Sequence, residues 1–171
     1  MAERFVALLR AVNVGGTGKL EMAELRRMAE AAGFTGVRTY IASGNVVFGA
    51  QTSEPEVKAI LEAALAEYAG KPVGVMVRTA AEMAAVRDAN PFPDAQGSRV
   101  TAIFLDAPPT PDMLDAVTNR ADEELVLGTR ELYVHYPSGM GRSKLVIKGA
   151  AAGTARNMNT VARLAEMAAE I

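Results

Sequence analysis

In residues 4–78 the spacing of apolar residues alternates between the pattern of a strand and that of a helix. This alternation is the strongest constraint on the fold. Short β-rich runs (RFVALLRAV, VRTYIA, NVVF and VGVMV) each predict a strand, and SGN joins the middle two as a hairpin. Apolar residues recur at helical spacing from Glu21 to Ala32 and from about Glu54 to Tyr68, and a glycine follows each segment. The order β-α-β-β-α-β predicts the split βαβ arrangement of a ferredoxin-like plait.

The second half nearly repeats this order. NPFPDAQGS, rich in proline, glycine and polar residues, marks the best boundary, so we expect one lobe over residues 1–92 and another over 93–171. RVTAIFLDA predicts a strand, and a helix with Thr110 as N-cap and Pro111 at its first position follows. ELVLGTRELYVHY then predicts a hairpin, and GMGRSKLVIKGA predicts a helix.

The repeat breaks at its last element. A complete plait would end in a strand, whereas TARNMNTVARLAEMAAEI predicts a helix with an apolar face from Met158 to Ala169. That face must be buried, and the first lobe is the natural place. The predicted fold class is therefore α+β, with two ferredoxin-like lobes of the βαββαβ type. The second lobe is incomplete and ends in an extra helix docked on the first.

Composition excludes several classes of protein. The sequence has no cysteine, which excludes disulfides and thiolate chemistry, and its one histidine argues against a His-rich metal site, so no metal is expected. The N-terminal MAERFVALLRAV carries charges inside its apolar run, so it does not predict a signal peptide, and no run reaches membrane-spanning length. We expect a cytoplasmic protein with no membrane partner. The net charge of −2 gives no general attraction to nucleic acid.

The polar segment TARNMNT is the first candidate for a binding site. With Thr154 as N-cap, the predicted helix has Asn157 at the edge of its buried side and Asn159 facing outward. Arg156 then lies in the first helical turn, where a cation opposes the helix dipole. An arginine beside free N–H groups is typical of an anion site. The alternative, a surface or inter-lobe salt bridge, stays open.

Two glycine-rich segments carry further candidates. PSGMGRSKL places Arg142, Ser143 and Lys144 at a predicted helix start, where N–H groups can converge on an anion. The pattern favours the alternative, a capped helix with solvated lysines. RAVNVGGTGK follows the first strand and has neither the spacing of a dinucleotide fingerprint nor the ending of a P-loop. SGN is a hairpin turn first, and Asn45 would contact a ligand only where that turn borders a cleft.

Taken together, LLRAVNVGG, MAELRRM, VRTYIASGNVVF, NPF, GRSKL and TARNMNTVARL resemble the bacterial family named domain of unknown function 1697. The resemblance runs from Phe5 to about Leu164. Relative to the usual pattern of that family, Ala11 stands for a glycine and Met158 for a tryptophan. The resemblance implies a two-lobed α/β-plait fold and no known activity.

The motifs are polar, cationic and glycine-rich, and they lie at the ends of elements. They predict a cleft between the lobes that binds a small phosphate- or carboxylate-bearing ligand. The candidate ligand-binding residues are Arg10, Asn13, Gly15, Gly16, Lys19, Ser43, Asn45, Arg142, Ser143, Lys144, Arg156 and Asn159. The alternatives are a plait that binds single-stranded nucleic acid, for which NVVF offers only Phe48 as a stacking aromatic, and a protein-interaction module. The sequence identifies no catalytic set, no cofactor and no oligomeric state.

Overall fold

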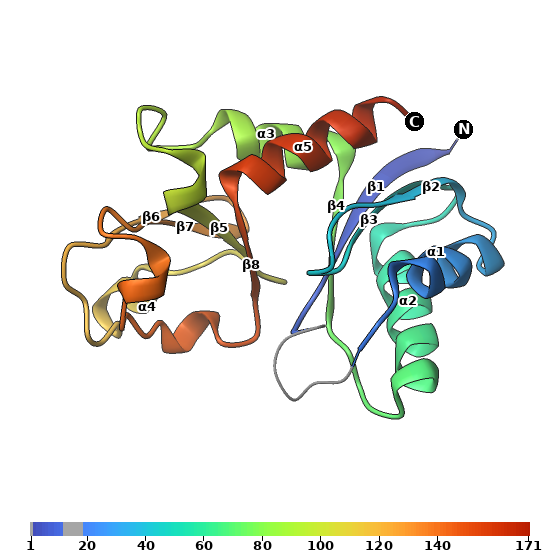
Figure 1. Cartoon of the computed structure of the whole chain (residues 1–171), viewed down its shortest axis with the longest axis horizontal. Helices are drawn as coiled ribbons and strands as arrows, with labels where there is room; N and C mark the ends of the chain where they lie inside the picture. Colours follow the sequence, from blue (N-terminus) through green and yellow to red (C-terminus); the bar gives the residue numbers. More distant parts are fainter. Residues whose placement is uncertain (1, 12–18) are drawn as a thin grey trace. The chain divides into compact units, whose positions relative to one another are not determined.

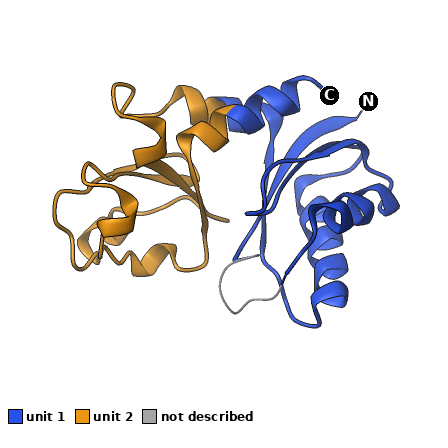
Figure 2. Ribbon diagram, viewed as in Figure 1, with its two compact units in different colours: residues 1–84, 163–171 blue, residues 85–162 orange. Residues whose placement is uncertain are grey.

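The computed structural model describes residues 2–11 and 19–171, and the chain divides into two compact units. Unit 1 consists of residues 1–84 and 163–171, and unit 2 consists of residues 85–162 (Figure 2). Each unit contains one four-stranded sheet in which every pair of neighbouring strands is antiparallel. The predicted α+β class is therefore confirmed.

Unit 1 has the element order that the sequence predicts (Figure 1). Its elements are β1 (Glu3–Leu9), α1 (Met22–Ala31), β2 (Thr35–Thr39), β3 (Asn45–Ala50), α2 (Glu54–Ala69) and β4 (Val75–Thr79). The strands lie in the order β2-β3-β1-β4. The end of β1 therefore lies beside the start of β4, where Leu9 is paired with Val75.

The core of unit 1 lies between this sheet and the two helices. Alternate residues of β1, among them Phe5 and Leu9, belong to one buried cluster with Leu25 of α1 and Leu61 of α2. Helix α2 is well defined at both ends. The Ser53 Oγ accepts a bond from the Glu56 N–H at 3.4 Å, and Gly70 ends the helix in the left-handed region with φ of 70°.

Unit 2 contains most of the remaining elements. They are η1 (Gly97–Arg99), β5 (Val100–Phe104), α4 (Pro111–Asp115), β6 (Glu124–Leu127), β7 (Glu131–His135), η2 (Met140–Arg142), η3 (Lys148–Ala150) and β8 (Thr154–Asn157). Two helices cross the division between the units: α3 (Ala80–Asp88) and α5 (Met158–Ala169). The strand order in unit 2 is β6-β7-β5-β8.

The final strand of unit 2 corrects the sequence prediction. Residues 154–157 form β8, which pairs with β5 so that Ala102 faces Arg156, and the helix begins only at Met158. The second sheet therefore has its fourth strand. The prediction of an incomplete repeat was wrong because Thr154 and Arg156 are the buried residues of this strand, so its alternation is not hydrophobic.

Both helices predicted for the middle of unit 2 are also corrected. The helix opening at Thr110 has five residues, and the GMGRSKLVIKGA segment forms two short 3₁₀ turns. Glycines at 139, 141 and 149 and the β-branched Val146 and Ile147 disfavour a helix there. Val146 instead makes an antiparallel bridge with Thr118.

The end of the chain belongs to unit 1. The Arg4 Nη1 donates to the Ala169 carbonyl at 3.0 Å, and Arg38 forms an ion pair with Glu170 at 2.7 Å. That bond lowers the pKa of the Glu170 carboxyl. A Cβ on Gly36 would lie 2.9 Å from the Ile171 Cγ2, so the last residue packs directly on β2. Among the described residues, no helix is long and apolar enough to span a membrane.

Candidate functional site

A pocket of about 470 Å³ lies at the end of the unit 1 sheet where β1 finishes and β4 begins. Three of its lining residues are cationic and come from separate segments of the chain: Arg10, Lys19 and Lys71. Its other described lining residues are uncharged, namely Ala11, Leu20, Leu65, Tyr68, Ala69, Pro72, Val73 and Gly74. The described lining therefore combines three cations, no carboxylate and a largely apolar floor.

Backbone bonds hold Arg10 at this position. Its N–H donates to the Gly74 carbonyl at 2.8 Å, which extends the pairing of β1 with β4 by one residue. A Cβ on Gly74 would lie 3.6 Å from both the Cβ and the Cδ of Arg10. The arginine stem therefore passes beside Gly74 at a distance that would give an ordinary van der Waals contact with a Cβ.

The two lysines reach the pocket by different routes. The left-handed conformation of Gly70 ends α2, and the chain turns directly into Lys71 and Pro72. Lys19 lies before α1, and its Nζ is 3.0 Å from a carboxylate oxygen of Glu21. Both partners of that ion pair are largely exposed, so it contributes little to stability.

The other predicted residues of the first lobe have different outcomes. Asn13, Gly15 and Gly16 lie outside the described residues. Asn45 is fully buried, and its Nδ2 donates to the Tyr40 carbonyl at 2.8 Å and to the Ser43 Oγ at 3.0 Å. These bonds give both side chains a role in fixing the β2–β3 turn.

In unit 2, Arg142, Ser143 and Lys144 line a second pocket, of about 510 Å³. Asp122 and Glu123 line the same pocket, so its charge is mixed. Ser143 does not cap a helix. Its hydroxyl donates to a carboxylate oxygen of Glu123, and the Ala121 N–H donates to the other oxygen at 2.6 Å.

The environment of Glu123 identifies this group as a structural tie between two loops. The bond from Ser143, assisted by the bond from the Ala121 N–H, lowers the pKa of the Glu123 carboxyl. Arg142 and Lys144 are exposed, and neither forms an ion pair with a residue that the structure describes. They are available to a ligand, whereas Ser143 is engaged.

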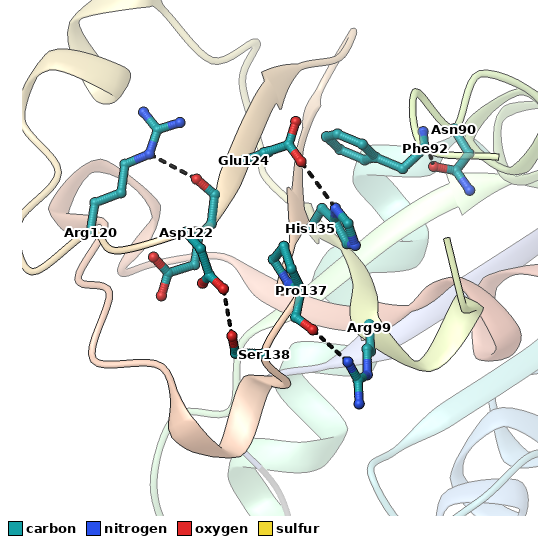
Figure 3. A network of polar contacts seen from close by, with 10 residues as sticks. Asn90, Phe92, Arg99, Arg120, Asp122, Glu124, His135, Pro137 and Ser138 are labelled. Carbon is teal, nitrogen blue, oxygen red and sulfur yellow. Dashed lines mark hydrogen bonds and ion pairs between the residues drawn. The ribbon is translucent and has the colours of Figure 1, made fainter. Parts of the chain in front are cut away.

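Several polar contacts lie around His135, where the ends of β6 and β7 pair, and in the neighbouring loops of unit 2 (Figure 3). The His135 Nδ1 lies 3.3 Å from a Glu124 carboxylate oxygen, and its ring lies 5.1 Å from the ring of Phe92. Nearby, the Arg99 guanidinium donates to the Pro137 carbonyl and Ser138 donates to Asp122. In the described parts of the chain, no group of three or more histidine, cysteine, aspartate or glutamate side chains could hold a metal ion. These contacts connect neighbouring segments of unit 2 to one another.

Arg156 is not at a helix start. It lies on β8 and is 7% exposed, and its Nη1 donates to the Thr154 Oγ1 at 2.7 Å and to the Ala155 carbonyl at 2.9 Å. Burial lowers the pKa of Arg156 to about 10. The prediction that it stands in a first helical turn was wrong.

The two asparagines that follow have different outcomes. Asn157 caps α5, because its Oδ1 accepts a bond from the Thr160 N–H at 2.9 Å. Asn159 is exposed, as predicted, and its side chain lies against Gly97. Thr154 is the first residue of β8, so it cannot be the N-cap that the sequence suggests.

Comparison with known proteins decides the family. The family model described as "Protein of unknown function (DUF1697)" matches residues 2–133. The chain belongs to this family. The match includes Arg10, Lys19 and Lys71 and ends before the segments that carry Arg142 and Arg156.

A solved structure shares the fold of this DUF1697 protein. The conserved bacterial protein SP0830 from Streptococcus pneumoniae aligns over 98% of this chain and 99% of its own, with 21% sequence identity and a TM-score of 0.80. A search of curated proteins found no sequence similar to this chain.

Sequence reasoning missed Lys71 and Tyr68 of the unit 1 pocket. A usable signal was present, because a βαββαβ order places the end of the first strand beside the start of the fourth. The segment YAGKPVG, which leads into β4, therefore had to lie near Arg10. In this chain that loop carries Lys71 to the pocket that Arg10 lines.

Proposed function

We propose that this protein binds a small anionic ligand, carrying phosphate or carboxylate, in the unit 1 pocket. The observation that supports the proposal is the convergence of Arg10, Lys19 and Lys71 on one pocket whose described lining has no carboxylate. Positive charges gathered from three segments on one partly enclosed pocket attract an anion. Arginine and lysine also form the strong charge-assisted hydrogen bonds that such an anion accepts.

The proposed site is smaller than the cleft that the sequence predicts. It needs only groups of unit 1, and a cleft that also includes Arg142, Lys144 and Arg156 stays a prediction. The pocket volume lies within the roughly 300–1,000 Å³ typical of sites for small organic ligands. A small metabolite is therefore favoured over a free ion as the natural ligand.

We also infer that each unit is a ferredoxin-like plait. Support comes from the matching strand orders, β2-β3-β1-β4 and β6-β7-β5-β8, and from the antiparallel pairing of all neighbours. Unit 1 adds both crossover helices, α1 and α2, in the positions that the plait requires.

Nucleic-acid binding is less well supported. A plait that binds single strands needs exposed aromatic rings on its sheet. Phe48 is buried in the core cluster of unit 1, and Val6, Leu8 and Val47 on the opposite face of the sheet are also fully buried.

The test is isothermal titration of the full chain with inorganic phosphate and with citrate. We expect heat of binding from the wild type and a loss of affinity of about tenfold or more in Arg10→Gln and in Lys71→Gln, because each substitution removes a charged hydrogen bond. Matched controls are Arg26→Gln, an exposed arginine of α1 paired with Glu30, and Lys148→Gln in unit 2.

Both controls should bind as the wild type does. The proposal is wrong if neither anion binds, or if the controls lose as much affinity as the pocket variants. Circular dichroism of each variant establishes that the fold is retained.

A further inference from the structure

Tyr68 lies in the last turn of α2 and lines the unit 1 pocket with 44% of its surface exposed. No other aromatic side chain in the described part of the chain is exposed to this degree. A large ring facing solvent in a pocket offers a flat surface on which another ring can stack.

The surroundings of Tyr68 favour an apolar partner. Leu65, one turn earlier on α2, is buried in the core cluster, and Leu20 is also buried, so the pocket has an apolar floor beside the ring. A simple phosphate ion would leave this floor and the ring uncovered. A ligand with a planar apolar part would cover the exposed face of the ring and gain from the water that it releases.

The ring and one of the three cations are close along the chain. The left-handed turn at Gly70 places Lys71 on the same pocket as Tyr68, three residues earlier. Arg10 lines this pocket beside Gly74. One compact ligand can therefore reach the ring with one end and the cations with the other.

We infer that the ligand is a phosphate monoester joined to a flat heteroaromatic ring, of which a mononucleotide is the type. Its phosphate binds Arg10, Lys19 and Lys71, and its base stacks on Tyr68. This inference rests on the proposed function, because it assigns the anion end of the ligand to the same three cations. The cavity of about 470 Å³ has room for more than a phosphate group.

The test compares AMP with two compounds, each of which has one of the two parts of AMP. AMP carries phosphate and ring, ribose 5-phosphate carries phosphate without the ring, and adenosine carries the ring without phosphate. With the wild type, we expect AMP to bind about fivefold to a hundredfold more tightly than ribose 5-phosphate, the range expected for one stacked base. Adenosine should bind more weakly than AMP.

Two variants of one residue give the matched control. Tyr68→Leu keeps an apolar side chain and loses the ring, so the preference for AMP over ribose 5-phosphate should disappear. Tyr68→Phe keeps the ring, so the preference should be retained. Both affinities are measured on each variant, which makes the ratio independent of any change in the amount of folded protein.

The outcomes separate the two proposals. If ribose 5-phosphate binds as tightly as AMP to the wild type, or if Tyr68→Leu keeps the preference, the ring inference is wrong while anion binding stands. If no phosphate compound binds, both fail. A 5′-phosphorylated trinucleotide that binds more tightly than AMP would overturn the assignment to a free nucleotide and point to a strand end.

Discussion

Both units build an antiparallel sheet with the equivalent strand order, but different structures cover the core face of each sheet. In unit 1, α1 and α2 pack their apolar sides on β1 and β3. In unit 2, the five-residue helix α4 and the irregular segment from 136 to 153, whose backbone Figure 1 shows, cover the sheet. Their apolar residues pack against the buried cluster. Leu145 and Ile147 of that segment pack against the buried Ile103 and Leu132.

The comparison shows that burial of the core face can be achieved without regular helices. Leu132 and Val134 in unit 2 are as fully buried as Val46 and Phe48 in unit 1. Burying apolar surface stabilises a sheet whichever backbone conformation provides the cover. A long helix provides the cover with its own hydrogen bonds satisfied, whereas an irregular segment depends on side-chain bonds to fix its backbone.

The largest difference in stability between the units should appear when one apolar side chain is removed from the helix that covers each sheet. Leu61→Ala in α2 should lower the free energy of unfolding by about 3 kcal/mol, because Leu61 is fully buried in the core. Met113→Ala in α4 should cost about 1 kcal/mol, because Met113 is only partly buried. Urea denaturation measures both. Equal losses would show that the two covers contribute alike.

As the pH falls, the segments that cover the sheet of unit 2 should lose stability before the helices that cover the sheet of unit 1. The pKa of Glu123 is lowered in the folded state, so its bonds to Ser143 and Ala121 stabilise the protein above the usual carboxyl pKa. That contribution is lost as the pH falls through the lowered value. Glu123→Gln should therefore reduce the melting temperature at neutral pH and have no further effect in strong acid.

Hydrogen exchange can locate the acid effect. As the pH falls, protection of the amide of Leu145, which donates to the Ser143 Oγ, should decrease before that of the amides in α2. The exposed Glu67→Gln serves as the control and should leave the acid profile unchanged. Simultaneous loss of protection in both segments would contradict this prediction.

The stability that helix caps contribute should also differ between the units, by a smaller amount. Ser53→Ala should cost about 0.5–1 kcal/mol, because Ser53 caps α2 through a long hydrogen bond. Thr110→Ala should be nearly neutral, because Thr110 makes no side-chain cap bond to α4. Asn157→Ala, at the well-formed cap of α5, is the positive reference at about 1 kcal/mol. Thermal unfolding curves compare the three, and a Thr110 loss as large as that of Asn157 would refute the ranking.

The smallest expected effect concerns the β2–β3 turn. Ile41 has φ of 50°, is exposed and is β-branched, a combination that costs backbone energy. Ile41→Gly should therefore stabilise unit 1 by about 0.5 kcal/mol, since the strain it relieves exceeds the entropy that glycine adds to the unfolded chain. In the β6–β7 turn no described residue other than glycine has a positive φ, so Thr129→Gly should destabilise instead. Chemical denaturation of both variants checks the opposite signs.

Sequence patterns predicted unit 1 well because its strands and helices have apolar periods that match their backbone. The same method failed for β8, where the buried positions carry Thr154 and Arg156 and hydrophobic periodicity gives no strand signal. It failed for residues 139–150 because a plausible spacing of apolar residues outweighed three glycines and two β-branched residues.

For the candidate site too, the sequence patterns identified some of the residues that line the pocket and missed others. Arg10 and Lys19 were predicted, and both line the unit 1 pocket. Lys71 was missed because it has no motif around it and is brought to the pocket by strand pairing. Ser43 and Asn45 were predicted as ligand contacts, but their hydrogen bonds fix a turn, which a motif alone cannot distinguish from a binding role.

Because unit 1 ends with residues 163–171, the ribosome completes this unit last, although it begins it first. After Ala84 has been added, a further 86 residues (85–170) must be translated before Glu170 can pair with Arg38. At typical rates of about 5–20 residues per second, this takes roughly 4–17 s. During that interval all of unit 2 is made and can fold, while the first 84 residues wait for their final contacts.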